Sequence, residues 1–255
     1  MPFQRLVWFF TTLAGMTVLS TQATPPPVDV PAVIERNYEA ARSLHTKNPD
    51  DDQAAWQFGR ACFDRAEFSR DDAERAHLAN EGMTACRNVI IHQPKLAYGH
   101  YYLGMNLAQL ARTKLLGALP LLSQMENEWK AALALDEKMD HAGPDRYVGL
   151  LYRDAPGWPV SLGDNAKARQ HLLRAVELSP NFPENQLNLI ESLFSWNEDA
   201  AARRAAEKLR LLWPAAHQEF AGEYWEVSWK DWNQRLDKIQ ARLGSRPETP
   251  PAGKK

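Results

Sequence analysis

Apolar and small residues return along the chain in a pattern that predicts helical hairpins. In each repeat, the first helix carries a central small or apolar residue, and the second alternates small and bulky residues at intervals of three and four. The clearest copy starts at Tyr147, continues through Ala168, Leu172 and Ala175, and closes at Pro180. Sequence periods of roughly 20 to 50 residues mark stacked repeats. The pattern therefore predicts an all-α protein with a surface built for binding.

Four segments carry this pattern. The central positions of their first helices are Gly59, Gly104, Gly149 and Ile190. The four units close at Pro94, Glu137, Pro180 and Pro214. The last two prolines lie 34 residues apart (214 − 180), the period of tetratricopeptide repeats, whereas the first three units are longer than standard between their helices. We therefore predict a tetratricopeptide-like helical-hairpin solenoid with lengthened hairpins. An ordinary helical bundle with chance matches is the alternative.

Amphipathic helices are predicted at both ends of the array. Residues 29–44 carry one apolar stripe, and residues 217–243 form a second helix rich in aromatic side chains, including Trp225, Trp229 and Trp232. Repeat arrays need terminal caps that cover their exposed core. We therefore assign both helices as caps of a domain that spans residues 32–244. The alternative for the aromatic helix is a strip that binds a partner.

The first 23 residues are organised like a secretory signal peptide. Arg5 precedes an apolar run from Leu6 to Leu19, and the small residues Thr21 and Ala23 follow at the expected cleavage site. The run is too short for a comfortable membrane span, although an uncleaved anchor is the alternative. Residues 24–31 read as a Pro-rich linker and residues 245–255 as a disordered tail. These features predict an exported protein, periplasmic in a host with two membranes.

Composition and motifs argue against several classes of function. The chain has 30 Lys and Arg residues against 32 Asp and Glu residues, a net charge of -2 and no basic tract, so nucleic-acid binding is not expected. The sequence lacks the motifs of serine hydrolases, phosphate-binding loops and zinc proteases. Its 7 His residues are scattered, which does not favour a metal site. We predict a non-catalytic protein without a cofactor or metal.

The two cysteines, Cys62 and Cys86, fall on facing positions of the first predicted hairpin. An oxidising compartment permits a disulfide between them, because the two helices bring their side chains together. The alternative is that both are small buried apolar residues with free thiols.

The inward-facing positions of the first helices are the predicted binding surface. Aromatic rings supply apolar contact area, and arginine binds carboxylates through paired hydrogen bonds. This mixture suits a small organic acid or an acidic segment of a partner; the alternative is that the rings are core and the arginines solvated. A rigid Pro-Gly loop presents Trp158, which either lines a cleft or fills a gap between long helices. The predicted binding residues are Trp56, Arg60, Tyr98, Tyr101, Met105, Arg146, Arg153 and Trp158, and the same positions of the fourth unit hold Glu184, Leu187 and Glu191.

Most of the chain after the signal segment resembles the T-component family of TRAP transporters, most clearly in the segments RYVGLLYRDAPGWP (146–159), SLGDNAKAR (161–169) and HLLRAVELSP (171–180). In that family a glycine-containing helix, a Pro-Gly loop and a repeat element in the second helix occur in this order. The resemblance implies an all-helical periplasmic accessory protein that associates with a solute-binding protein. It also implies trimers in some members, and clefts for a hydrophobic ligand. Members are often lipid-anchored, whereas this chain has no cysteine just after its apolar run. The alternative function is a general tetratricopeptide scaffold for protein interactions in envelope assembly.

Overall fold

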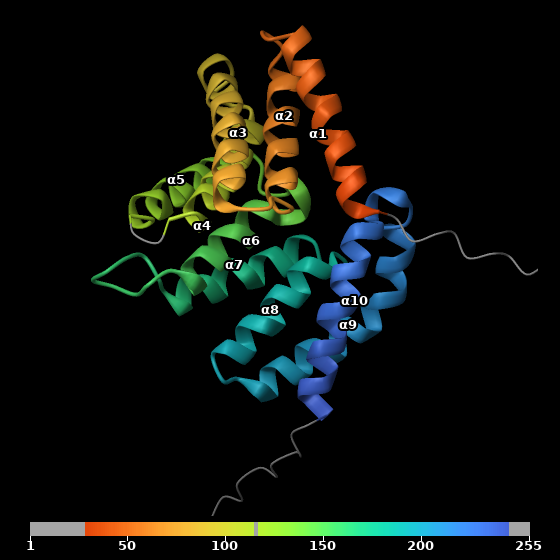
Figure 1. Cartoon of the computed structure of the whole chain (residues 1–255). Coiled ribbons are helices and arrows are strands. Elements are labelled where there is room, and N and C mark those ends of the chain that lie inside the picture. Colours follow the sequence, from red (N-terminus) through yellow and green to blue (C-terminus); the bar gives the residue numbers. More distant parts are fainter. Residues whose placement is uncertain (1–28, 115–116, 245–255) are drawn as a thin grey trace, which may run out of the picture.

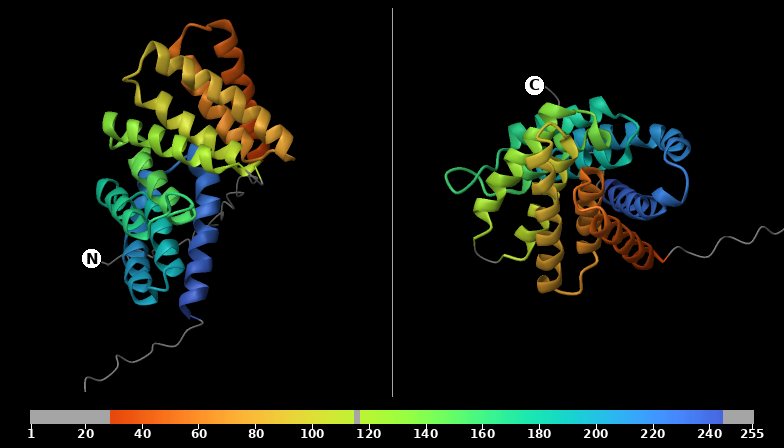
Figure 2. Two further views of the ribbon diagram at one scale, coloured as in Figure 1. Left: turned by 90° about the vertical axis from the view of Figure 1, so that its left-hand side faces the viewer. Right: turned by 90° about the horizontal axis from the view of Figure 1, so that it is seen from above.

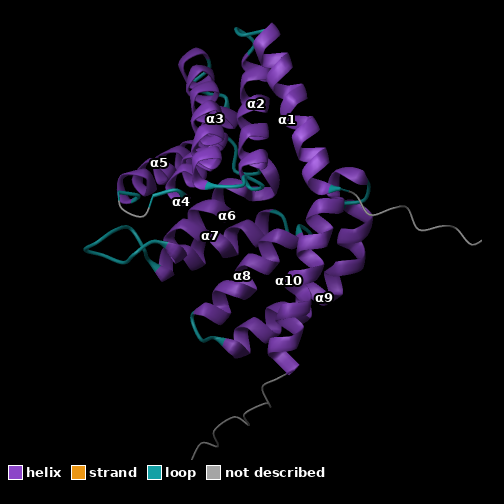
Figure 3. Cartoon of the chain, viewed as in Figure 1, coloured by secondary structure: helices purple, strands orange, loops and turns teal. Residues whose placement is uncertain are grey.

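Helices account for nearly all of the described chain (Figures 1 and 3). The computed structural model describes residues 29–114 and 117–244. The predicted signal peptide, residues 24–28 of the predicted linker and the predicted tail lie outside this part of the chain. The helices are α1 (Val30–Lys47), α2 (Asp52–Ala66), α3 (Asp72–His92), α4 (Ala97–Arg112), α5 (Leu119–Leu135), α6 (Met139–Asp154), α7 (Asn165–Leu178), α8 (Pro183–Ser195), α9 (Asp199–Glu219), the short 3-10 helix η1 (Glu223–Trp225) and α10 (Glu226–Gly244).

Eight of these helices pair into four hairpins that stack in chain order, as predicted. The pairs are α2–α3, α4–α5, α6–α7 and α8–α9, and the second helix of each hairpin also packs against the first helix of the next. One apolar cluster joins the first three hairpins, and a second joins the fourth hairpin to α10. A third cluster lies where α1 packs on the first hairpin. The core therefore follows the stack from one end to the other.

Glycine in the first helix lets its partner helix approach closely, as the repeat pattern predicted. A Cβ atom at Gly104 would lie within 3 Å of the indole ring of Trp129, which is 2% exposed. A Cβ atom at Gly149 would lie 2.8 Å from Cγ of Leu172. Because such distances are shorter than packed carbon atoms allow, only glycine fits between these helices without moving them. The fourth hairpin has Ile190 at this position.

Added length takes two forms in the hairpins. In the first and fourth hairpins the second helices, α3 and α9, have 21 residues each. In the third hairpin the helices have ordinary lengths, but the loop 155–164 separates them and projects from the solenoid (Figure 1). The base of this loop is fastened by hydrogen bonds from Gly163 N to Pro156 O and from Asp164 N to Tyr152 O, both 2.9 Å. The third unit thus holds a longer loop, and the length of the second helix does not distinguish the first unit from the fourth.

Two predicted boundaries were wrong. α1 begins at Val30, so Val30 and Pro31 belong to a helix and not to the linker; the Asp29 carboxylate caps it, and proline in a first helical turn lacks only an unused N–H. The fourth unit does not close at Pro214, because α9 continues through it to Glu219. Proline inside a helix costs about 3 kcal/mol. Side-chain packing offsets this cost: Ala216 is buried, and His217 stacks on Trp229 with ring centroids 3.6 Å apart.

At the two ends of the array, α1 packs beside α2 of the first hairpin, whereas α10 lies beside α8 of the fourth (Figures 1 and 2). α10 packs along α8, the first helix of the fourth hairpin. η1, just before α10, reaches the first hairpin, where the Tyr224 hydroxyl accepts a hydrogen bond from Arg60 Nη2. The C-terminal segment therefore turns inward, from the fourth hairpin towards the first. Among the described helices, none has both the length and the apolarity that crossing a membrane requires.

Candidate functional site

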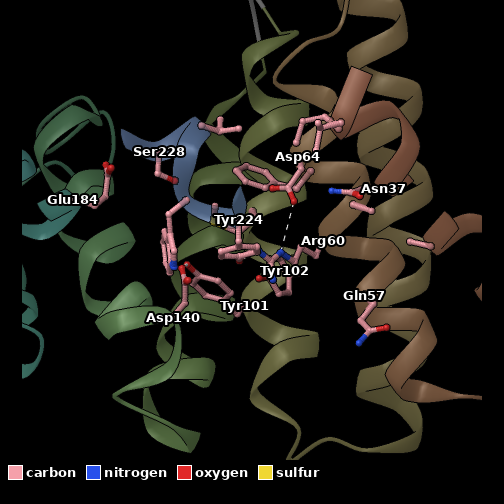
Figure 4. Close-up of a pocket in the computed structure, with 18 of the residues that line it drawn as sticks. Asn37, Gln57, Arg60, Asp64, Tyr101, Tyr102, Asp140, Glu184, Tyr224 and Ser228 are labelled. Atoms are coloured by element: carbon pink, nitrogen blue, oxygen red, sulfur yellow. Dashed lines mark hydrogen bonds and ion pairs between the residues drawn. The ribbon is translucent and has the colours of Figure 1, made fainter. Parts of the chain in front are cut away.

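A pocket of about 700 Å³ opens on the inner face of the solenoid (Figure 4). Its described walls come from α1, α2, α4, the start of α6, the start of α8, η1 and the start of α10. The second helices of the hairpins contribute none of these lining residues. The terminal segments thus turn an open inner face into a walled pocket.

The start of α6 places a carboxylate in this pocket through an unusual backbone turn. Asp140, His141 and Ala142 have φ angles of 46°, 54° and 62°, which lie in the left-handed region. Residues with a Cβ atom enter this region at a cost of about 1 to 2 kcal/mol each. Regular helix resumes at Gly143, where a Cβ atom would lie 2.9 Å from Asp140 Oδ2. The turn holds Asp140 beside Tyr101, whose hydroxyl donates to Asp140 Oδ2.

Arg146 supports this turn from inside the protein. Its side chain is 3% exposed. Nη1 donates to the carbonyl oxygens of Asp140 (3.2 Å) and His141 (3.3 Å), and to Asn185 Oδ1 (2.9 Å). Nη2 donates to Asp140 Oδ2 at 2.8 Å. Both terminal nitrogens of Arg146 are thus already used to hold the turn, and a role for Arg146 in binding a ligand stays a prediction.

Arg60 and Asp64 stand one helical turn apart on α2 and form the opposite wall. Arg60 Nε lies 3.6 Å from Asp64 Oδ2, and each side chain is 37% exposed. The Arg60 guanidinium also lies over the Tyr224 ring, 5.5 Å from its centroid. Burial raises the pKa of Asp64 to about 6; Asp140 and Glu67 add to this shift, whereas Arg60 opposes it. Arg60 therefore stabilises the ionised carboxylate of Asp64 by less than burial destabilises it.

Aromatic rings form much of the floor. Tyr101 and Tyr102, on α4, are 1% and 6% exposed. Behind them, the Trp56 ring stacks on Tyr98 and on Tyr102, with centroids 4.2 Å and 5.8 Å apart. The Tyr102 side chain lines the pocket, yet its hydroxyl has no hydrogen-bond partner among the described residues. This hydroxyl is open to the pocket, so it is a position where a ligand can form a hydrogen bond.

The structure brings half of the predicted binding residues together. Arg60, Tyr101, Met105 and Arg146 line the pocket. Trp56 and Tyr98 lie behind its floor in the aromatic stack. Two residues lie elsewhere. Arg153 bonds to Asp154 and to Ser192 Oγ, and Trp158 is 87% exposed on the projecting loop, where it neither lines a cleft nor fills a gap. A rigid Pro-Gly turn kept that ring out of the core.

The remaining key side chains were missed by sequence reasoning. Asp64, Tyr102 and Asp140 line the pocket from the first three hairpins, and Tyr224 enters it from the C-terminal segment. One signal was present: Tyr102 follows Tyr101, in a helix where both could pack inward. The left-handed turn at Asp140 and the path of the segment with Tyr224 had no sequence signal, because both depend on long-range packing.

In the predicted inner-face positions of the fourth unit, two carboxylates are bound by the chain itself. Glu191 accepts hydrogen bonds from Arg235 Nε and Nη2, both 2.8 Å, and Glu184 accepts one from Nη1 at 2.8 Å. Trp232 Nε1 donates to the other oxygen of Glu184 at 2.7 Å. Leu187 is fully buried. The inward orientation of Glu184 and Glu191 is as predicted, and α10 occupies the face they form.

Both cysteines are buried and have free thiols. Burial raises the pKa of each thiol, so the reactive thiolate is rare at neutral pH. The structure therefore corresponds to the alternative of two small apolar residues. A disulfide in an oxidising compartment stays a prediction.

Comparison with known proteins gives the fold. Neither a protein-family model nor a curated protein matches this sequence. Among solved structures, the chain is similar to TTC0263, a thermophilic tetratricopeptide-repeat protein of Thermus thermophilus, with a TM-score of 0.59 and 16% identity over 82% of this chain and 92% of that one. It is also similar to MamA, with a TM-score of 0.51 and 13% identity over 73% of this chain and 92% of that one. This is a tetratricopeptide-like solenoid. The predicted all-α hairpin fold is confirmed, whereas the resemblance to the T-component family stays a prediction.

Proposed function

We propose that this protein is a non-catalytic interaction scaffold that holds a segment of a partner protein in its inner-face pocket. The observation that carries the proposal is the pocket itself, which has aromatic walls and polar groups without partners, on the face that the first helices of all four hairpins share. The tetratricopeptide-like fold supports it, since such stacks present extended concave surfaces for binding. Such a pocket, about 700 Å³, falls within the range of about 300 to 1,000 Å³ common for binding sites.

A polypeptide is the proposed occupant because the adjoining part of the same face already binds one. Over the fourth hairpin, α10 packs against α8 through Trp232 and Arg235. Over the first three hairpins, the equivalent face opens into the pocket. A partner segment that enters there would continue the surface that α10 begins.

The sequence resemblance supplies a specific partner for this scaffold. A solute-binding protein of a TRAP transporter is the partner that the T-component likeness implies, and export to the periplasm is the location that residues 1–23 imply. Trimer formation belongs to the same hypothesis, as does a small hydrophobic ligand. An assembly partner in the cell envelope is the alternative, and it agrees better with the tetratricopeptide neighbours.

The test selects partner segments and then blocks the pocket. The immobilised full chain is used to select from a phage library that displays fragments of the host's own proteins, and each enriched segment is then synthesised. We expect fluorescence anisotropy to show that Asn37→Trp weakens binding of these segments at least tenfold, because Asn37 is exposed on α1 at the pocket wall, has no hydrogen bond to a described residue, and a bulky ring there narrows the pocket.

The matched control is Asn127→Trp. Asn127 is also an exposed helical asparagine without hydrogen bonds to described residues, but it lies on α5 and does not line the pocket. Its binding should stay within twofold of the unmodified protein. Equal binding to both variants would place the partner elsewhere and overturn the proposal. Purified TRAP solute-binding protein, tested in the same assay, decides between the two classes of partner.

A further inference from the structure

We propose that the pocket recognises a cationic group, an alkylammonium or a guanidinium, which binds against the carboxylates of Asp64 and Asp140 beside the Tyr102 hydroxyl. The inference rests on the proposed function, because it names the chemistry by which the pocket holds its partner. The cation is either a Lys or Arg side chain of the partner segment or a free diamine, and the experiment below separates these sources.

Not every charged group in the pocket is available to a ligand. Arg146 is 3% exposed and spends its two terminal nitrogens on the turn at Asp140. Arg60 is bound to the Tyr224 hydroxyl and lies beside Asp64. Arg60 and Arg146 are therefore held by the protein's own groups, whereas Arg36, exposed on α1 at the pocket wall, has no partner among the described residues. An incoming carboxylate that approached Arg60 would also meet the negative charge of Asp64.

Two carboxylates of the pocket, those of Asp64 and Asp140, have oxygen atoms that lack hydrogen-bond partners among the described residues. Asp64 accepts no hydrogen bond from a described residue, and its ion pair with Arg60, at 3.6 Å, is longer than a hydrogen bond. Asp140 uses Oδ2 for Tyr101 and Arg146, whereas Oδ1 has no hydrogen bond in the described chain. The side chains of Asp64 and Asp140 are 37% and 38% exposed. Each can therefore receive an N–H donor from a ligand.

The tyrosine side chains in the pocket walls also favour a cation. Tyr102 adds a hydroxyl acceptor on a side chain that is only 6% exposed, and Tyr101 adds a second ring. Aromatic faces attract cations, and pairs of this kind are already formed nearby, with Arg146 over Tyr147 and Phe182 at 5.1 Å and 5.2 Å. Carboxylates among aromatic rings suit an ammonium or guanidinium better than an anion or a neutral group.

The protein itself contains an example of such recognition on the same face. Over the fourth hairpin, the chain's own α10 inserts Arg235 between Glu184 and Glu191, and Trp232 packs beside it. The inner face thus already binds one polypeptide segment through a cation and an aromatic ring. The open pocket offers a similar set of groups, two carboxylates and tyrosine rings; Arg60 and Arg146 contact only Oδ2 of each carboxylate, so both Oδ1 atoms stay open to a further cation.

The experiment titrates the full-length protein with small probes by isothermal titration calorimetry. The probes are Nα-acetyl-lysine amide, its neutral isostere Nα-acetyl-norleucine amide, cadaverine and glutarate. We expect the lysine derivative to bind with a Kd on the order of 1 mM, and the norleucine derivative and glutarate to bind at least tenfold more weakly. A lysine derivative that binds more tightly than cadaverine indicates a partner side chain, and the reverse order indicates a free diamine.

Variants connect the probe to the pocket. Asp64→Asn should weaken the lysine derivative at least tenfold, and Tyr102→Phe about threefold, because each removes one acceptor. Asp237→Asn makes the same charge change at an exposed position of α10 that does not line the pocket, and it should change the Kd less than twofold. Circular dichroism checks that each variant is folded; should Asp64→Asn unfold, Tyr102→Phe still decides the question.

Two results would overturn the inference: tighter binding of glutarate than of the lysine derivative, or lysine affinity that Asp64→Asn and Tyr102→Phe leave unchanged. Failure of the inference is distinguishable from failure of the proposed function. If partner segments are displaced by Asn37→Trp but are insensitive to Asp64→Asn and to the cationic probes, the scaffold function stands and only the cation is wrong.

Discussion

The inner face of the solenoid is open over the first three hairpins and covered by the chain's own α10 over the fourth. Both regions are built from the first helices of the same repeat, and both present carboxylates and aromatic rings. In the covered region a helix supplies the missing arginine. In the open region, Asp64 and Asp140 keep unused acceptor atoms. The same repeat geometry thus gives a paired interface over the fourth hairpin and a surface with unused acceptor atoms over the first three.

The pKa values of two carboxyls express this difference. Burial raises the pKa of both, but at Glu184 the charges of Arg235 and Arg146 outweigh burial, and the pKa lies below its ordinary value. At Asp64 burial prevails over Arg60, and the pKa rises to about 6. A carboxylate on this face therefore needs a closely bound cation to be stable in its charged form. In the fourth hairpin Arg235 lies 2.8 Å from Glu184, whereas in the pocket Arg60 lies 3.6 Å from Asp64.

The largest expected effect comes from breaking the covered region. Arg235→Ala leaves Glu184 and Glu191 without their guanidinium, and removing one partner of a mostly buried ion pair costs about 3 kcal/mol or more. We expect the Tm to fall by about 6 to 12 °C, measured by thermal unfolding with circular dichroism. The control is Arg210→Ala, whose ion pair to Glu207 is 3.8 Å long and two-thirds exposed, and which should change the Tm by less than about 2 °C. Equal losses would contradict the role of Arg235.

A second, smaller effect tests what the first three hairpins share and the fourth does not. Gly104→Ala should destabilise the protein by about 2 kcal/mol, because the added methyl group would overlap the buried Trp129 ring. Urea unfolding measures this loss. Gly244→Ala, at the end of α10 where nothing lies within 4 Å of the new Cβ atom, should have almost no effect. A neutral result for Gly104→Ala would show that this helix pair has room to separate.

The smallest expected effect concerns Asp64 in the unliganded protein. Because its native pKa is about 6, above the ordinary value of 3.8, the folded state releases this proton later than the unfolded state, and stability falls as the pH rises from about 4 to about 6. Asp64→Asn has no proton to release. We expect its Tm to exceed that of the unmodified protein by about 1 to 3 °C at pH 7, a modest gain because the site is partly solvated.

The pH series supplies its own control. Below about pH 4 the carboxyl is protonated in both states, so the difference in Tm between the two proteins should disappear. An Asp64→Asn variant that is less stable at pH 7 would mean that the Arg60 ion pair is worth more than burial costs. In that case the contrast between the two regions would be weaker than described.

The four hairpins could be predicted because their signal is local. Gly59, Gly104 and Gly149 return in register with the bulky residues that pack against them, and helix-forming residues fill the intervals. The inward orientation of Arg60 and Tyr101 followed from the same register. The spacing of residues along the chain carries this information, so it can be read without the three-dimensional structure.

The site could be predicted only in part because its decisive features are not local. Arg146 faces the pocket as expected, but burial and the left-handed turn at Asp140 occupy it, and no spacing rule signals such a turn. Tyr224 comes from a segment expected to cap the last unit. Pro214 was expected to end a helix, and packing of Ala216 and His217 carried the helix past it. In each case tertiary contacts overrode a local preference.

The contact between Arg60 and Tyr224 joins residues 164 positions apart. Most contacts in a repeat stack join neighbours, so hairpins can form one after another as the chain emerges, whereas distant pairings must wait. The pocket wall that Tyr224 supplies therefore belongs to the last stage of maturation, after synthesis has passed residue 224. A chain cut in the short connection before η1 would lose this wall together with α10 and its packing on the fourth hairpin, so completeness of the C-terminus and competence to bind are linked.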